Sequence, residues 1–418
     1  MSILFAGEAP ALHPGRCLNR RHAGAACTRC VDSCPVAAIS LVANTPQLDA
    51  DACVRCGVCL PTCPTDSFTP ALDYERKLRE TVANLPQTPT ALVCAAHPAP
   101  AQTRAKVEAV VQHRRCLAAL SPADLLELSA GGHRPLWLDD SPCATCAIGA
   151  AQETLHSAVD AARALLRATG RPPAMLLHSE RPPAEEARLH RTPLYDGAQP
   201  AISRRSFLTR LRPGRAATDE IPAVEEQVRR SAPLAERLPQ QTPASRRQLL
   251  AALASLMIEH VGELPAACAS LGAVQVESEL CSGCTLCARF CPTGALQFEQ
   301  TEERFVLSFQ PAACIDCGIC IAACPEDAIQ KGTSVALAAL VRDDAIRLAA
   351  GDLAPCAVCG VATKAGDDAQ DVRCHVCRQG AGVVTSLRDD AGLMADLLKR
   401  SLRQDIYVRS KWVEWPAT

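Results

Sequence analysis

The stretch from Cys281 to Pro325, CSGCTLCARFCPTGALQFEQTEERFVLSFQPAACIDCGICIAACP, decides the fold of its region. It contains the spacing C-x2-C-x2-C-x3-C-P twice, with 21 residues between the two copies. Three cysteines at i, i+3 and i+6 in a tight loop can reach three corners of a cubane cluster, and the fourth, next to proline, points toward a second cluster. Eight cysteines in this order favour two such clusters over a pair of zinc knuckles.

This pattern resembles the bacterial two-cluster ferredoxin family, over roughly residues 274–332. The resemblance implies a βαβ-βαβ module with two [4Fe–4S] clusters, short strands at Ala273–Glu277 and Phe305–Phe309, and a helical turn after each Cys-Pro pair. Gly283 and Gly318 are expected to let backbone N–H groups approach the cluster sulfurs. The expected ligands are Cys281, Cys284, Cys287 and Cys324 for one cluster, and Cys314, Cys317, Cys320 and Cys291 for the other.

The N-terminal cysteines repeat this arrangement with one departure. The motif from Cys53 to Pro64 is intact, whereas the motif that ends at Pro35 has Gly24 where its first cysteine belongs. Cys17, ten residues before Cys27, is the spare sulfur that could complete the set. The expected ligands are Cys17, Cys27, Cys30 and Cys63 for one cluster, and Cys53, Cys56, Cys59 and Cys34 for the other.

The role of Cys17 stays open at this point. If Cys17 is not a ligand, the first site is a three-cysteine [3Fe–4S] cluster or a labile one. If it is a ligand, Arg20, Arg21 and His22 are expected to lie over the same cluster. Their positive charge would then raise the reduction potential of that cluster relative to the other three.

Four more cysteines lie between the two ferredoxin-like motifs, in a segment whose expected elements alternate. Strands are expected at 91–94, 135–140 and 174–179, and helices at about 101–113, at 121–132 and from about residue 146 onward. Ligand sites gather at the carboxyl ends of strands in such α/β layers. The four cysteines at or near these ends are Cys94, Cys116, Cys143 and Cys146.

The order of these four cysteines resembles the small iron–sulfur domains of hydrogenase delta and heterodisulfide-reductase subunits. Three hypotheses stay open for them. They bind an additional Fe–S cluster, or Cys143-x2-Cys146 works as a redox dithiol, or they are ordinary buried cysteines. The nearby His97, His113 and His133 are not assigned as ligands.

The last cysteines form two knuckles of the kind seen in zinc ribbons. Fourteen residues separate the two C-x2-C pairs, which is enough for a hairpin. Four thiolates predict a tetrahedral single-metal site, with zinc favoured over a redox-active iron. The expected ligands are Cys356, Cys359, Cys374 and Cys377, and His375 is not needed because four thiolates close the site.

Composition limits the class of protein. The chain has 418 residues, 25 of them cysteine, and a net charge of −2. This charge argues against binding to nucleic acid or to an anionic membrane. The sequence shows no signal-peptide core and no apolar run of about 18 residues or more, so we expect a cytoplasmic protein without a membrane span. Clustered cysteines in such a chain indicate a metalloprotein rather than a disulfide scaffold.

Other segments carry weaker patterns. Residues 181–245 lack cysteine and are rich in proline and arginine, which predicts a linker. Within it, Ile202–Leu208 is close to a twin-arginine export motif but lacks the apolar run that should follow, so a basic linker segment is preferred. Packing helices are expected at Gln248–His260 and Ala336–Ala349. We find no nucleotide-binding fingerprint.

Together these patterns predict an α+β protein that carries electrons as a polyferredoxin. The expected cofactors are four [4Fe–4S] clusters and one zinc or iron ion, and a further Fe–S cluster at the middle cysteines stays open. The expected partners are redox proteins, in a hydrogenase, formate dehydrogenase or heterodisulfide-reductase-like complex. The alternative is a self-contained redox enzyme that uses the middle cysteines as a dithiol or cluster active site. No catalytic residue is assigned.

The expected domain order follows the cysteine groups. Cys268 is left without a role. The expected boundaries are 1–75 for the first ferredoxin-like module, 88–180 for a small α/β domain, 181–245 for the linker, 246–335 for the second module, and 350–418 for the metal ribbon and a C-terminal helix.

Overall fold

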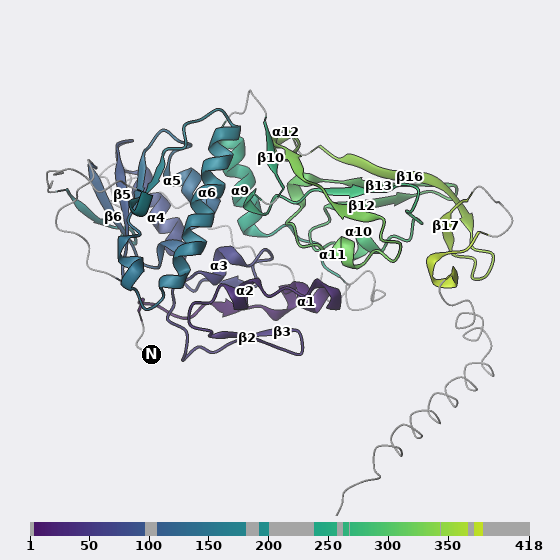
Figure 1. Ribbon diagram of the computed structural model, residues 1–418, viewed down its shortest axis with the longest axis horizontal. Helices are drawn as coiled ribbons and strands as arrows, with labels where there is room; N and C mark the ends of the chain where they lie inside the picture. Colours follow the sequence, from purple (N-terminus) through teal and green to yellow (C-terminus); the bar gives the residue numbers. More distant parts are fainter. Residues whose placement is uncertain are drawn as a thin grey trace, which may run out of the picture.

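The computed structural model describes residues 4–96, 107–180, 192–199, 238–256, 262–266, 268–342, 344–366 and 372–378. Most of the predicted linker, the Ile202–Leu208 motif, His97 and the expected C-terminal helix lie outside these residues. The described residues form an elongated molecule of mixed α and β structure (Figure 1). Two cysteine-rich parts and a parallel sheet make up its three main parts. None of the described helices is long and apolar enough to cross a membrane.

The N-terminal part is built from two short antiparallel strand pairs and one-turn helices. β1 pairs with β4, and β2 pairs with β3. Helices this short are unstable alone, so the cysteine loops depend on the core and on bound metal for their shape. The elements are β1 (Ala11–Leu12), α1 (Leu18–Arg21), α2 (Arg29–Asp32), β2 (Ile39–Val42), β3 (Thr45–Leu48), α3 (Cys59–Thr62) and β4 (Phe68–Thr69).

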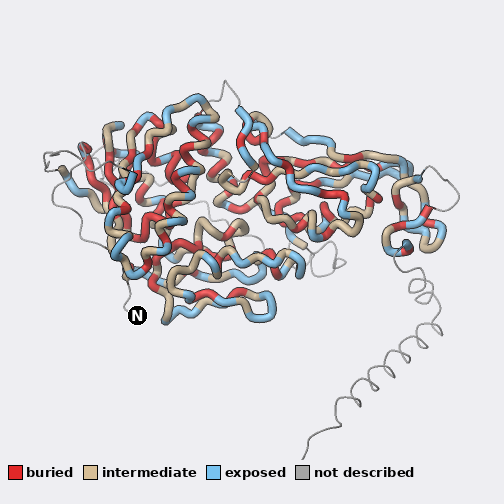
Figure 2. The backbone as a smooth tube through the Cα atoms, in the orientation of Figure 1, coloured by how far each residue is buried: buried red, intermediate tan, exposed pale blue. Residues whose placement is uncertain are grey.

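The middle part is a five-stranded parallel sheet with the strand order β8-β7-β5-β6-β9. Helices pack against it and bury the largest apolar core of the described residues, which appears as dense red in Figure 2. The elements are α4 (Tyr74–Ala83), β5 (Thr90–Cys94), β6 (Ala109–His113), α5 (Pro122–Leu128), β7 (Leu136–Leu138), α6 (Gln152–Ala168), β8 (Met175–Leu177) and β9 (Leu194–Asp196). The small α/β layer expected from the sequence is present.

Two expectations for this part are wrong. The expected helix at 101–113 ends in strand β6, because Val110 and Val111 are fully buried between β5 and β9. β-branched residues buried on both faces of a central strand lose the alternation that marks a strand in sequence. The helix expected from about Cys146 begins only at Gln152, and Cys143 lies in the 3-10 turn Ser141–Thr145.

The second cysteine-rich part contains a four-stranded antiparallel sheet, β12-β13-β16-β17, and the pair β11-β14. The strands predicted at 273–277 and 305–309 are confirmed as β11 and β13. The elements are β11 (Val274–Val276), α10 (Leu286–Phe290), β12 (Leu296–Gln300), β13 (Arg304–Phe309), α11 (Ile319–Ala322), β14 (Ile329–Lys331), β16 (Ile346–Pro355) and β17 (Ala362–Lys364).

The helix expected at Ala336–Ala349 is also wrong in its second half. Only α12 (Leu337–Val341) is helical, and from Ile346 the chain pairs with β13 as strand β16. The Ala-rich sequence favours helix, but β13 offers unpaired backbone groups that β16 satisfies. Gly351 lies against Phe305, where an added Cβ would come within 3.1 Å of the ring. Pairing with β13 therefore determines that this segment is a strand and not a helix.

One segment ties the second cysteine-rich part to the middle sheet. Helix α9 (Ala244–Ser255) confirms part of the helix expected at 248–260, and its Leu249 and Leu253 enter the core of the middle part. The pair β10 (Glu263–Pro265) and β15 (Ser334–Ala336) joins the same core. The shared core holds the second cysteine-rich part against the middle sheet.

Candidate metal centres

The four cysteine loops share one backbone pattern. The residue before the second cysteine position of each loop has a positive φ: 42° at Ala26, 62° at Arg55, 68° at Gly283 and 49° at Asp316. The residue three positions after the cysteine of each Cys-Pro pair is also left-handed, at Ala37, Asp66, Gly294 and Asp327. Such values cost energy at non-glycine residues and persist where the surroundings require them. The loop that departs from the motif shares these two positions with the three intact loops, but it differs after its second cysteine position, where Thr28 has a φ of −117° and the intact loops have positive values at Gly57, Thr285 and Gly318.

We call the first thiol set site A; it consists of Cys17, Cys27, Cys30 and Cys63. Burial raises the pKa of Cys30 to about 11, and the three other thiols of the set add to the rise. The amide of Asn19 holds the loop, donating to the carbonyl of Cys27 at 2.8 Å and accepting from its N–H at 2.7 Å. The structure therefore brings Cys17 to the other three thiols, as the sequence predicts.

Site B consists of Cys34, Cys53, Cys56 and Cys59. Burial raises the pKa of Cys56 to about 11, and the thiols of the same set contribute. Gly57 has a φ of 81°, and an added Cβ would lie 2.6 Å from Cδ of Arg115. Arg115 donates to both carboxylate oxygens of Glu75 on α4, at 2.7 and 2.9 Å. This buried ion pair packs directly on the cysteine loop of site B.

Sites C and D each enclose a cavity lined by all four of the predicted thiols. Site C consists of Cys281, Cys284, Cys287 and Cys324, and site D of Cys291, Cys314, Cys317 and Cys320. Each cavity has a volume of about 20 Å³. The Cys287 thiol of site C raises the pKa of Cys320 in site D, so the two sites adjoin.

The chemistry of these donor sets fits iron–sulfur clusters. Burial, followed by the neighbouring thiols of each set, raises the pKa of Cys287 and Cys314 to about 12. Unliganded thiols here are therefore neutral at pH 7, and a cationic metal group supplies the charge that lets them bind as thiolates. Backbone N–H groups also reach the sulfurs, as Ser67 does at Cys63 over 3.3 Å. Such hydrogen bonds tune iron–sulfur clusters.

The middle site gathers the four cysteines that the sequence places near the ends of strands. They are Cys94, Cys116, Cys143 and Cys146, and they line one cavity of about 20 Å³. Its volume is the same as those of sites C and D. From β5 the chain goes first to β6 on one side and then to β7 on the other. Ligands of parallel sheets bind at such a switch point.

The middle site has a mostly apolar lining and lies close to site B. The Cys116 thiol donates to the Cys94 sulfur, which lowers the pKa of Cys94. The N–H of Cys116 donates to the carbonyl of Cys56 at 3.3 Å, which joins the middle site to site B. Burial and then the Asp140 carboxylate raise the pKa of Cys143 to about 11. A thiol with a raised pKa is a poor nucleophile at neutral pH.

The C-terminal knuckles form a tighter set, the ribbon site. The Sγ atoms of Cys356, Cys359, Cys374 and Cys377 all lie within 4.8 Å of one another. Those of Cys359 and Cys374 are 3.6 Å apart. A tetrahedral ion with metal–sulfur bonds of about 2.3 Å requires sulfurs about 3.8 Å apart, so this set fits one metal ion. Burial raises the pKa of Cys356, but N–H groups led by that of Cys374 lower it to about 6.

The ribbon site rests on the cysteine loop of site C. The hydroxyl of Thr363 donates to the carbonyl of Ser282 at 3.0 Å. Lys364 Nζ donates to the carbonyl of Ser278 at 2.7 Å. Arg378, next to the last knuckle, forms an ion pair with Glu326 beside site C.

The expected position of the basic residues that follow Cys17 is wrong. Arg20 is exposed, and the side chains of Arg21 and His22 face site D instead of site A. Arg21 donates to the carbonyl of Cys291 at 2.9 Å, and the His22 ring meets the edge of Phe290 at 4.9 Å. No motif spacing carries this information, because the loop direction depends on how the two cysteine-rich parts dock.

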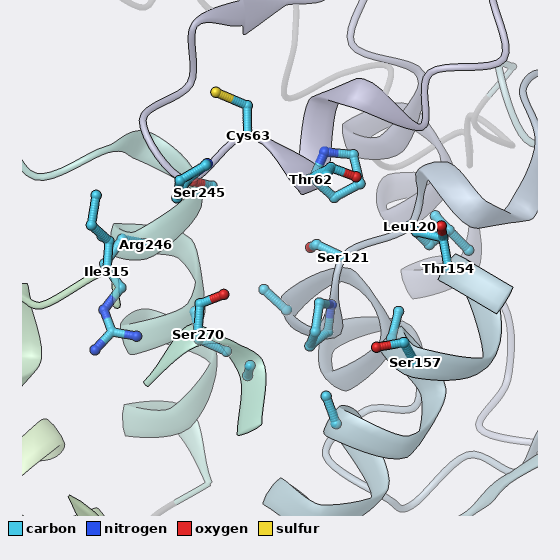
Figure 3. Close-up of a pocket in the computed structure, with 18 of the residues that line it drawn as sticks. Thr62, Cys63, Leu120, Ser121, Thr154, Ser157, Ser245, Arg246, Ser270 and Ile315 are labelled. Carbon is cyan, nitrogen blue, oxygen red and sulfur yellow. The ribbon is translucent and has the colours of Figure 1, made fainter. Parts of the chain in front are cut away.

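An open cavity lies where the three parts of the molecule meet (Figure 3). Hydroxyl groups from all three parts line it, and Cys63 of site A borders it. The hydroxyl of Ser121 donates to Asp124 and that of Ser245 to Asp66, both at 2.6 Å. The Ser245 bond joins α9 to the N-terminal part, whereas the Ser121 bond caps α5, and we assign no catalytic role to either hydroxyl.

Comparison with known families agrees with this geometry. Residues 25–67 and 280–328 each match the family model of the 4Fe-4S dicluster domain. The chain therefore carries two iron–sulfur regions of ferredoxin type, as the repeated motif predicts. Cys17 and the middle and ribbon sites lie outside the matched segments. No solved structure matches the chain.

Proposed function

We propose that this protein conducts single electrons along a series of iron–sulfur clusters held at sites A, B, C and D. The observation that carries the proposal is the joining of neighbouring thiol sets by direct contacts. Bound clusters would supply the one-electron redox chemistry. The chain itself positions the thiolates, excludes water and sets the charge around each site. Two ferredoxin-type regions support an electron-transfer role.

The contacts support an electron route in the order middle site, B, A, D and C, with the ribbon site resting on the site C loop outside that route. The two sites of each ferredoxin-type region exchange the cysteine of each Cys-Pro pair, so A adjoins B and C adjoins D. Between the regions, Leu18 and Cys27 beside site A pack with Ile319 and Cys317 at site D. The electrons thereby have a continuous route between the two regions.

We extend the proposal to a fifth iron–sulfur cluster at the middle site. Four thiols line a cavity comparable in volume to those of sites C and D, and one of them is hydrogen bonded to the site B loop. The rival hypothesis is a redox enzyme that uses Cys143 and Cys146 as a dithiol. The convergence of all four thiols on one cavity favours the cluster, since a dithiol needs only two of them.

For the ribbon site we propose a structural zinc ion. The sulfur separations fit one tetrahedral ion, and zinc is the usual occupant of four-cysteine knuckles. The proposed setting is a larger cytoplasmic oxidoreductase complex of the hydrogenase, formate dehydrogenase or heterodisulfide-reductase kind. No catalytic residue is proposed for the chain itself.

The test is a metal count on the full chain purified without oxygen. Four cubanes give about 16 Fe per chain with about one Zn, and a middle cubane raises the iron to about 20. Acid-labile sulfide should equal the iron, because each cubane holds equal numbers of both. Little iron with several zinc ions per chain would overturn the electron-transfer proposal.

The middle site needs its own variant. Cys143→Ser should remove the iron above the four-cluster count and leave the remaining clusters intact. If the iron count stays the same while a disulfide-reductase activity disappears, the dithiol enzyme is the correct function. The ribbon ion is identified in the same samples by whether the single extra metal is zinc or iron.

A further inference from the structure

Besides Arg29, whose Nη2 donates to the carbonyl of Asp316 at 3.1 Å, site D is flanked by two arginines that do not belong to its own cysteine loops. The first is Arg21, from the loop between Cys17 and Cys27. Its Nη2 donates to the carbonyl of Cys291 at 2.9 Å, Nε to that of Phe290 at 2.7 Å, and Nη1 to that of Pro239 at 2.6 Å. All three bonds use neutral carbonyls, so no carboxylate cancels the guanidinium charge in these contacts.

The second is Arg246, from helix α9. Only 5% of this residue is exposed. Its Nε and Nη2 donate to the carbonyls of Ala312 and Pro311 at 2.8 and 2.9 Å, just before Cys314 of site D. Its Nη1 is buried and has no hydrogen-bond partner among the described residues. Burial lowers the pKa of Arg246 to about 10, and the Cys314 thiolate opposes that shift, so the group stays cationic at pH 7.

Both neighbours of site D have different surroundings. At site C, Lys364 lies near Cys281 and Glu326 near Cys284, so opposite charges offset each other. At site A, the basic loop turns away toward site D, and Arg29 also donates to the carbonyl of Asp316 in the site D loop. Reduction adds one negative charge to a cluster, and nearby buried cations favour that state.

We propose that Arg21 and Arg246 raise the reduction potential of the cluster at site D above those at sites A and C. The cluster at site D is then reduced by one electron while the cluster at site A or site C is oxidised by one electron. The electron therefore resides at site D, at the junction of the two regions. This inference rests on the proposed function. It also explains the sequence departure at Gly24: the displaced loop carries Arg21 across to the other region.

The test is a redox titration of the anaerobic full chain, followed by EPR. The signal of site D is identified as the one lost in Cys317→Ser. In the unsubstituted chain this signal should appear at a higher potential than those of sites A and C. Arg246→Gln and Arg21→Gln should each lower the equilibrium constant for its reduction about tenfold, which is 59 mV for a one-electron couple. The iron count, measured in parallel, should not change.

Two kinds of control separate charge from structure. Arg20→Gln and Arg247→Gln change exposed neighbours in the same two segments and should leave the midpoint in place. Arg246→Lys keeps the charge but cannot form the two-pronged contact with Ala312 and Pro311. A near-normal midpoint in Arg246→Lys supports the electrostatic role, whereas behaviour like that of Arg246→Gln would overturn it.

The remaining outcomes are also decisive. If iron is fully retained and neither glutamine variant moves the site D midpoint, the inference is wrong and the proposed electron-transfer function stands. If site D holds no cluster in the unsubstituted chain, both fail. Arg21→Gln keeps the test meaningful should the buried Arg246→Gln variant fold poorly.

Discussion

Cys17 is the residue on which the composition of site A depends. It lies outside the segment that matches the dicluster family, yet its sulfur joins those of Cys27 and Cys63. Cys17→Ser should remove a strong thiolate ligand. The expected result is a loss of four Fe per chain, or a loss of one with a [3Fe–4S] EPR signal. Metal analysis and EPR of the anaerobic protein measure this.

The matched control is Cys268→Ser. Cys268 is half-buried, and its thiol donates weakly to the carbonyl of Ala161 at 3.7 Å, away from the thiol sets. Its iron content and EPR spectrum should match those of the unsubstituted chain. An unchanged spectrum in Cys17→Ser as well would show that three cysteines hold the cluster at site A.

Glu75 is a second residue with a measurable effect, because it neutralises a buried cation beside site B. Arg115 is 5% exposed and Glu75 is 8% exposed. Glu75→Gln leaves the Arg115 charge uncompensated, which should cost about 3–5 kcal/mol of unfolding free energy. Glu80→Gln on the same helix removes an exposed pair with Arg76 and should cost about 0.5 kcal/mol or less. Denaturant unfolding of the anaerobic proteins compares them.

The effect of Glu75 depends on pH in a defined direction. Burial raises the pKa of Glu75, but the nearby His113, whose Nε2 lies 3.4 Å from Oε1 of Glu75, and then the Arg115 charge lower it overall. A carboxylate whose pKa is depressed on folding stabilises the native state above its unfolded pKa of about 4.3, and this stabilisation is lost as the pH falls through the folded value. The gap between Glu75→Gln and the unsubstituted protein should therefore narrow in acid. A gap that is already absent at neutral pH would contradict the role given to this pair.

At the scale of elements, local signals predicted some segments well. Ser121 caps α5 in a complete capping box with Asp124. The Ser-Pro pair before an apolar run predicts the start of a helix at this position. The cysteine loops follow from their spacing alone. The strands β6 and β16 do not, because Val110 and Ala349 become strand residues only through neighbours distant in sequence. The direction of the Arg21 side chain also depends on contacts distant in sequence, so it could not be predicted from the sequence.

The ribbon is an element whose metal can be removed separately. Cys374→Ser takes one of four ligands from a set that fits a single ion. The expected result is the loss of about one Zn per chain with the iron count unchanged, because the thiols of site C belong to other loops. A loss of iron instead of zinc would identify a redox-active ribbon site.

At the scale of the whole molecule, function depends on how the two ferredoxin-type regions meet. Leu18, Ile315 and Ile319 form a small buried cluster at this junction. Sites A and D lie on either side of it, so its packing fixes their separation. In Figure 1 the middle part lies to one side of both regions, and α9 lies between α6 and the second region. The shared core of the middle part packs against both regions. The packing of these parts thus determines the distances between the proposed clusters.

A substitution at Gly24 tests whether packing at this junction determines the distance between sites A and D. An added Cβ there would lie 3.3 Å from the Cβ of Ala322 and 3.1 Å from the His22 ring. Gly24→Leu should force the junction apart, since extra methyl groups in a packed contact cost about 1–3 kcal/mol. All four clusters should still be present. Electron exchange between sites A and D should slow, and their spin–spin broadening in the fully reduced EPR spectrum should weaken. Gly15→Leu, with nothing within 4 Å of its added Cβ, should change neither. If Gly24→Leu keeps its full iron content and its spin–spin broadening is unchanged, electrons do not cross between sites A and D at this junction. The proposed electron route would then be wrong at the step between A and D.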